Sequence, residues 1–127
     1  MALIDRGQGE VHNTCVAALK ALSSPLVTTW PCFTEAMYFL GDLKGWNGQK
    51  TLWQFIERGA LRVHISTDSE TQRMRVLIEK YSDTPMDLAD ASLLAAAESR
   101  ETDRIFTLDS DFRVYRINGS TAFEVVP

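Results

Sequence analysis

The sequence predicts an α/β fold in which helices cover both faces of a mostly parallel, twisted sheet. Short apolar and β-branched runs alternate along the chain with longer segments of helical periodicity, and that alternation is typical of βαβ units. The length of 127 residues and the hydrophobic content of 45% suit a single core. No internal repeat or low-complexity linker divides the chain, so we expect residues 1–127 to form one domain.

The first half of the chain is expected to hold three helices and two strands. The β-branched segment LVTTW predicts a strand in which Trp30, the residue before Pro31, is held extended. Gly59 is a stop signal for the third helix. In order, the predicted elements are helix 11–22, strand 26–30, helix 33–40, helix 46–58 and strand 60–66.

The second half is expected to hold two helices and two strands. Thr67 and Glu70 have the spacing of a capping box, so we expect a helix to begin there and to run through Tyr81. An alanine-rich helix follows, and Asn118-Gly119 is a strong turn signal. The predicted elements are helix 67–81, helix 87–99, strand 105–108 and strand 123–126.

Two acidic clusters lie next to these apolar segments. Asp87 and Asp90 are one turn apart at the start of the alanine-rich helix, and Asp109 and Asp111 follow a buried strand. In parallel sheets, functional sites form beyond the carboxyl ends of strands, where Asp109 is expected to lie. A structural explanation also exists for each cluster, because aspartates cap helices, suit the positive end of a helix dipole and stabilise turns.

A metal site is the functional interpretation of these carboxylates. Glu35 adds a fifth acidic group from a mostly apolar helix, although a solvated surface glutamate explains it equally well. If the carboxylates converge in space, their oxygen atoms suit Mg²⁺ or Mn²⁺. His12 and His64 have no spacing that suggests zinc, and the glycines match no nucleotide-binding loop.

The remaining features indicate a cytoplasmic protein without a membrane partner. Cys15 and Cys32 are isolated and are interpreted as small buried apolar residues in a reducing compartment. We find no apolar run of transmembrane length and no signal-peptide pattern in the sequence. The net charge of -4 argues against a general nucleic-acid coat protein but allows a local basic groove.

With these residues in view, the chain resembles the PIN (PilT N-terminus) domain family, in particular the VapC-type toxins of bacterial toxin–antitoxin pairs. The resemblance is carried by the segments TEAMYFL, DLADASLLAAAE and TLDSDF and runs from about Val11 to the C-terminus. It implies a three-layer α/β/α sandwich on a central, mostly parallel sheet. It also implies Mg²⁺- or Mn²⁺-dependent cleavage of RNA, in which the cations would activate water and stabilise the leaving oxygen.

Carried over residue by residue, the resemblance assigns catalytic and metal-binding roles to Glu35, Asp90 and Asp109. Asp87 and Asp111 become accessory metal ligands. These five residues are the candidate active site.

The family's first aspartate ends its first strand, and this chain departs from that pattern. In one interpretation the segment ALI is the end of that strand and Asp5 is the ligand. In the other, which we favour, Met1 begins downstream of the strand and Asp5 is no ligand. The second interpretation removes one carboxylate from the site.

The implied partners are RNA, a cognate antitoxin and a second copy of the chain. Arg104, Arg113 and Arg116 flank the TLDSDF segment and are candidate RNA contacts, although solvated surface charge also explains them. The apolar helices 33–40 and 46–58 are the candidate surface for an antitoxin helix or for dimerisation. The alternative function is a catalytically impaired PIN-like module that binds RNA or a protein, and an aspartyl phosphohydrolase ranks third.

Overall fold

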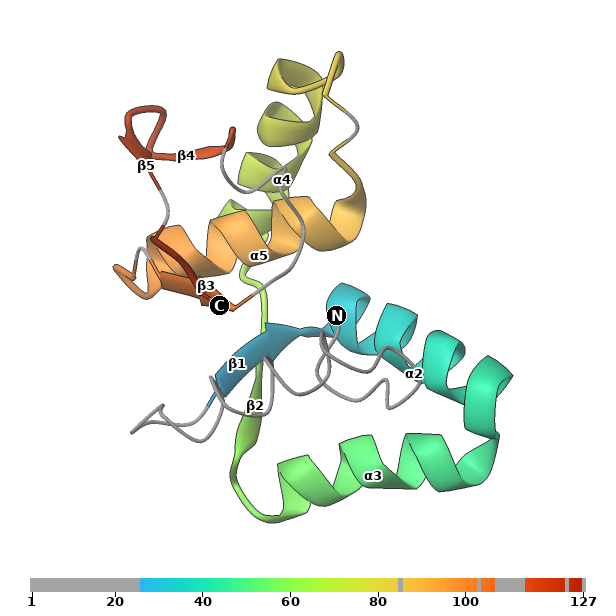
Figure 1. Ribbon diagram of the computed structural model, residues 1–127. Helices are drawn as coiled ribbons and strands as arrows, with labels where there is room; N and C mark the ends of the chain where they lie inside the picture. Colours follow the sequence, from blue (N-terminus) through green and yellow to red (C-terminus); the bar gives the residue numbers. More distant parts are fainter. Residues whose placement is uncertain (1–25, 85, 103, 107–113, 123, 127) are drawn as a thin grey trace.

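The computed structural model describes residues 26–84, 86–102, 104–106, 114–122 and 124–126. These residues form a mixed α/β arrangement (Figure 1). The elements are β1 (Leu26–Thr29), α2 (Trp30–Lys44), α3 (Trp46–Glu57), β2 (Leu61–His64), α4 (Asp68–Lys80), α5 (Leu88–Ser99), β3 (Arg104–Phe106), β4 (Arg116–Ile117), β5 (Thr121–Ala122) and β6 (Glu124–Val126). The helix predicted over 11–22 lies outside the described residues.

The described strands form three pairs, two of which are parallel. Strand β1 pairs with β2, from Leu26 opposite Leu61 to Thr29 opposite His64. Strand β3 pairs with β6, and the antiparallel β4–β5 pair is separate from both. The predicted parallel pairing is therefore confirmed for β1–β2 and β3–β6.

Strand β1 passes directly into helix α2, which corrects one prediction. Trp30 is the first residue of the helix and is not extended, because the strand already ends at Thr29, whose φ of -122° and ψ of 162° are extended. Pro31 is tolerated here since the first turn of a helix needs no hydrogen bond from its backbone nitrogen. The helix also continues past the predicted end at Leu40, to Lys44.

Helices α2 and α3 pack against each other at close range. A Cβ atom on Gly48 would lie 2.9 Å from the backbone oxygen of Leu40, so a larger residue there would push the helices apart. Helix α3 ends at Glu57, one residue earlier than predicted, and Gly59 follows with a φ of 74° as the expected stop.

The starts of helices α4 and α5 are both fixed by capping boxes. In α4 the Thr67 hydroxyl accepts from the Glu70 backbone N–H at 3.2 Å, and the Glu70 carboxylate accepts from the Thr67 N–H at 2.7 Å. This confirms the predicted capping box and its helix. Asp87 and Asp90 form the same reciprocal pattern in α5.

Helices lie against both faces of the β1–β2 pair (Figure 1). Alternate residues of a strand point to opposite faces, and β1 shows this pattern. Leu26 packs against a core cluster of α2, α3 and β2, whereas the Thr29 hydroxyl contacts Ser92 of helix α5. That first core cluster consists of Phe33, Ala36, Leu40, Leu52 and Leu61.

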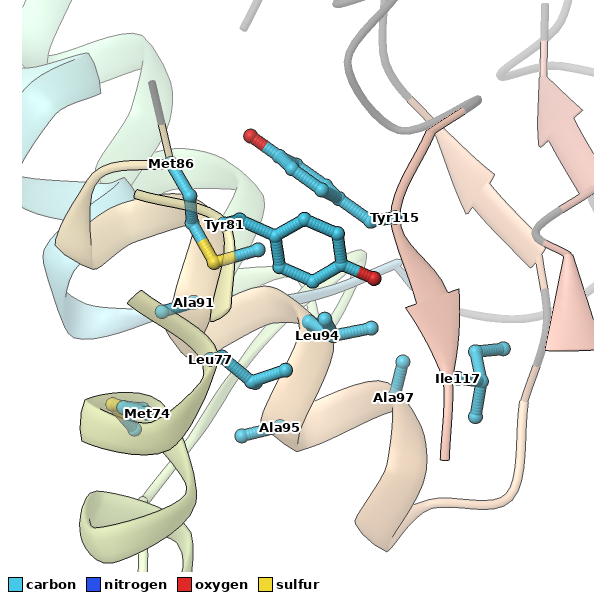
Figure 2. Packing of buried hydrophobic residues seen from close by; sticks show 10 residues of the cluster. All are labelled: Met74, Leu77, Tyr81, Met86, Ala91, Leu94, Ala95, Ala97, Tyr115 and Ile117. Carbon is cyan, nitrogen blue, oxygen red and sulfur yellow. The ribbon is translucent and has the colours of Figure 1, made fainter. Parts of the chain in front are cut away.

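A second core cluster joins α4 and α5 to strand β4 (Figure 2). Alanines on α5 allow the neighbouring elements to approach closely, and Leu77 and Leu94 are completely buried between them. The rings of Tyr81 and Tyr115 pack edge to face, with centroids 5.0 Å apart. The cluster consists of Met74, Leu77, Tyr81, Met86, Ala91, Leu94, Ala95, Ala97, Tyr115 and Ile117.

The Asn118-Gly119 turn is confirmed, and it connects two short strands that were not predicted. Asn118 and Gly119 have φ values of 51° and 79°, and the Ser120 N–H donates to the Ile117 carbonyl at 3.1 Å. The Asn118 N–H also donates to the carboxylate of Glu98 on helix α5. The hairpin is therefore tied to α5 by a charged side chain as well as by Ile117.

Two polar networks connect the helices at their ends. Glu98 receives two hydrogen bonds from Arg73 of α4, at 2.9 and 3.0 Å. His64, at the end of β2, contacts the buried carboxylate of Glu70 through Nε2 at 2.8 Å. Arg100 donates to His64 Nδ1 at 2.9 Å, so Nδ1 is the acceptor nitrogen and Nε2 carries the proton.

Leu94→Ala is expected to lower the free energy of unfolding by about 2–5 kcal/mol, because it opens a cavity in a fully buried part of the core. Leu88→Ala, at an exposed position of the same helix, should cost less than about 1 kcal/mol. Urea denaturation of both variants measures the difference. Equal losses would contradict the described packing of α5.

Glu98→Ala is expected to cost roughly 1.5–3 kcal/mol, because Arg73 and the Asn118 N–H lose a shared, largely buried acceptor. The matched control is Glu79→Ala in the exposed Arg75–Glu79 pair of helix α4. That variant should cost about 0.5 kcal/mol or less in the same urea titration.

Candidate functional site

The site is built where strand β1 ends and where helices α2 and α5 begin. The Thr29 and Ser92 hydroxyls lie 2.5 Å apart and are fully buried. Ser92 donates to the Ala89 carbonyl at 2.7 Å, so the proton between the two hydroxyls belongs to Thr29. Cys32 of α2 donates to the same carbonyl with a 3.5 Å sulfur–oxygen distance. These contacts hold the first turns of α2 and α5 next to each other.

Asp87 and Asp90 face each other across the first turn of helix α5. The Asp87 carboxylate accepts from the Asp90 N–H at 2.8 Å, and Asp90 Oδ2 accepts from the Asp87 N–H at 3.3 Å. The structural explanation given by the sequence, a helix cap, is therefore confirmed for Asp87 and extends to Asp90. Both carboxylates therefore accept hydrogen bonds from backbone N–H groups at the start of the helix.

Glu35 is an exposed residue on the first turns of α2 and lies near Asp87, which is also exposed. Partial burial of the Glu35 carboxyl raises its pKa, and the nearby negative charge of Asp87 raises it further. The structure therefore brings Glu35 and Asp87 together although 52 positions separate their numbers 35 and 87 in the sequence.

Cys32 is partly buried and lies near the same acidic groups. Burial is the main cause that raises the pKa of its thiol, and the charges of Glu35 and Asp90 act in the same direction. Hydrogen bonds with Thr29 and Ser92 oppose that rise. The thiol is therefore expected to be neutral at neutral pH.

Asp90 has a further partner that is distant in sequence. The phenol of Tyr115 donates to Asp90 Oδ2 across 3.4 Å, and Tyr115 itself is completely buried. This contact links the segment before strand β4 to the start of α5.

The carboxylates suit a hard divalent cation by their chemistry. Glu35 and Asp87 repel each other when both are ionised, and a cation between them would remove that repulsion. Within the part of the chain that the structure describes, no group of three or more His, Cys, Asp or Glu side chains could hold a metal ion. The other predicted ligands, Asp5, Asp109 and Asp111, lie outside the described residues.

The predicted RNA contacts are described only at Arg116. Its guanidinium donates to the backbone carbonyls of Val114 and Tyr115 at 3.2 and 3.0 Å. Arg113 and the side chain of Arg104 lie outside the described residues. Arg116 therefore supports the local chain conformation next to Tyr115.

Sequence reasoning missed four side chains that shape the site. Thr29 and Ser92 carried a weak signal, since each is a small hydroxyl residue at an otherwise apolar position next to a helix start. Cys32 gave no sign of its acidic neighbours. Nothing in the sequence around Tyr115 points to Asp90, 25 positions earlier.

The comparisons with known proteins assign no family. A scan against protein families found no match for this chain, and a search of curated proteins found none either. In the described residues, no helix has the length and apolar character needed to span a membrane.

Glu35→Gln is expected to stabilise the metal-free protein at neutral pH. Because folding raises the pKa of Glu35 above 4.5, the folded state holds this proton more tightly than the unfolded state does. Wild type and variant should therefore be about equally stable below pH 4.5. The wild type should then lose stability relative to the variant as the pH rises through the folded-state pKa.

The measurement is urea denaturation in a chelating buffer over that pH range. Asp87→Asn keeps a good helix cap but removes the neighbouring charge. In that background the effect of Glu35→Gln should shrink. An effect of unchanged size would show that Asp87 does not contribute to the Glu35 pKa.

Proposed function

We propose that this protein is an Mg²⁺- or Mn²⁺-dependent endoribonuclease, acting as the toxin of a toxin–antitoxin pair. The observation that carries the proposal is the proximity of Glu35 on α2 to Asp87, which caps α5 together with Asp90 at the carboxyl end of a parallel strand. In parallel sheets this is the usual position of a ligand site. Taken singly, each carboxylate has a structural explanation, but the proximity of Glu35 to the α5 cap does not follow from capping.

In this proposal Glu35, Asp90 and Asp109 are the catalytic metal ligands, with Asp87 and Asp111 as accessory ligands and Asp5 as a doubtful one. The bound cations would supply charge to lower the pKa of water and to neutralise the phosphate. The chain's own contribution is orientation. Asp87 and Asp90 are held by each other's backbone N–H.

The polypeptide also supports the proposal by keeping the carboxylates close despite their repulsion. The buried Thr29–Ser92 contact fixes β1 against α5 and thereby places α2, which begins immediately after Thr29, next to the α5 cap. A rigid scaffold of this kind is what preorganised metal ligation requires. After partial burial of the carboxyl, the charge of Asp87 is the second cause that raises the pKa of Glu35.

The full fold that we propose is the three-layer α/β/α sandwich of the PIN family. Its support is the resemblance of the acidic motifs together with two parallel strand pairs and helices on both faces of β1–β2. A cytoplasmic location belongs to the same proposal.

The surface of α2 and α3 is the site that we propose for an antitoxin or for a second copy of the chain. Large apolar side chains are exposed there, including Tyr38 and Trp46 at 78% and 61%. Exposed aromatic groups on a soluble domain are typical of protein interfaces. The other exposed apolar residues on these helices are Trp30, Phe39, Leu43 and Trp53.

The test of the proposed function is cleavage of RNA in the presence of Mg²⁺ or Mn²⁺. Asp90→Asn and Asp109→Asn should each lower the rate by at least roughly 100-fold, because each removes an anionic ligand. Asp42→Asn is the matched control, since Asp42 is an exposed aspartate two turns beyond Glu35 on the same helix. It should cleave like the wild type.

Two outcomes would overturn the proposal. Equal cleavage by all four proteins would show that the carboxylates are not catalytic. Binding of RNA without cleavage, at the same affinity with and without the cation, would favour the alternative of an inactive PIN-like binding module.

A further inference from the structure

Tyr115 is a buried polar side chain that the proposed reaction does not yet use. It has no exposed surface, and its ring is fixed by edge-to-face packing with Tyr81 in the α4–α5 core (Figure 2). A buried phenol hydroxyl is costly unless it finds an acceptor. The packed core, and not the acidic groups, therefore fixes the position of the Tyr115 side chain.

One acceptor of the Tyr115 hydroxyl is a carboxylate oxygen of the candidate site. Its hydroxyl lies 3.4 Å from Asp90 Oδ2, the same oxygen that accepts from the Asp87 N–H at 3.3 Å. Two donors from different parts of the chain thus converge on one oxygen of one carboxylate. Such convergence restricts the rotation of the carboxylate about its side-chain bonds.

We propose that Tyr115 is a positioning residue that holds the Asp90 carboxylate in the orientation needed to bind a divalent cation. This inference rests on the proposed function. Outer groups that hydrogen-bond to metal ligands fix the direction of those ligands and tune their affinity. Tyr115 has the features of such a group, because the packed core immobilises its ring while its hydroxyl reaches the ligand.

Tyr81 provides a matched control within the same aromatic pair. Its hydroxyl accepts a hydrogen bond from the Arg116 N–H at 3.0 Å. Tyr81→Phe and Tyr115→Phe therefore each remove one hydroxyl from the same buried cluster. Of the two, only the Tyr115 hydroxyl has a described contact with Asp90.

The first measurement is the side-chain rotamer of Asp90, from three-bond couplings between its Cγ and the backbone nitrogen and carbonyl carbon in metal-free protein. We expect one rotamer in the wild type and in Tyr81→Phe, and rotamer averaging in Tyr115→Phe. A single unchanged rotamer in Tyr115→Phe would overturn the proposal. Averaging in the wild type would also overturn it, and that result needs no variant to fold.

The second measurement is Mn²⁺ affinity, followed by the loss of the free-ion electron paramagnetic resonance signal. Tyr115→Phe should bind Mn²⁺ roughly 10-fold more weakly than the wild type, with Tyr81→Phe close to the wild type. Equal affinity in all three proteins would overturn the positioning role.

Failure of the proposed function would look different. If the wild type binds no Mn²⁺ and cleaves no RNA, the proposed function is wrong and there is no cation site for Tyr115 to support. The couplings would still establish whether Tyr115 restrains Asp90.

Discussion

The hydroxyl contact between Thr29 and Ser92 is the constraint on which the candidate site depends. It joins the last residue of β1 to the second turn of α5, and both residues are fully buried. The Thr29 hydroxyl donates to Ser92, and the Ser92 hydroxyl donates to the Ala89 carbonyl, so both buried hydroxyl groups have partners. Because α2 starts at the next residue, this contact also fixes where α2 begins. The carboxylates on both helices are consequently placed by buried uncharged groups.

The described part of the fold was predictable where local chemistry decides it. The helices that begin at Asp68 and at Leu88 follow from the capping pairs Thr67–Glu70 and Asp87–Asp90, because such pairs satisfy backbone donors within four residues. The prediction was wrong at Trp30, where proline at the start of a helix competed with its tendency to extend the preceding residue. Helix α2 extends beyond its predicted end to Lys44, where it packs against α3.

The candidate site was predictable by residue type and only partly by arrangement. Asp87 and Asp90 could be placed together from their spacing on a helix. The proximity of Glu35 to Asp87 and of Tyr115 to Asp90 depends on tertiary packing between segments that are 25 or more positions apart. A single sequence holds no local signal for such contacts.

The two core clusters have a consequence for the cooperativity of unfolding. Among the described residues they share no member: one cluster surrounds α2, α3 and β2, and the other surrounds α4, α5 and β4. Glu35 lies on α2, next to the first cluster, and Asp90 lies on α5, next to the second. A cation bound by both Glu35 and Asp90 would link the two clusters. Because a ligand stabilises only the state that binds it, the cooperativity of unfolding would then depend on the cation concentration.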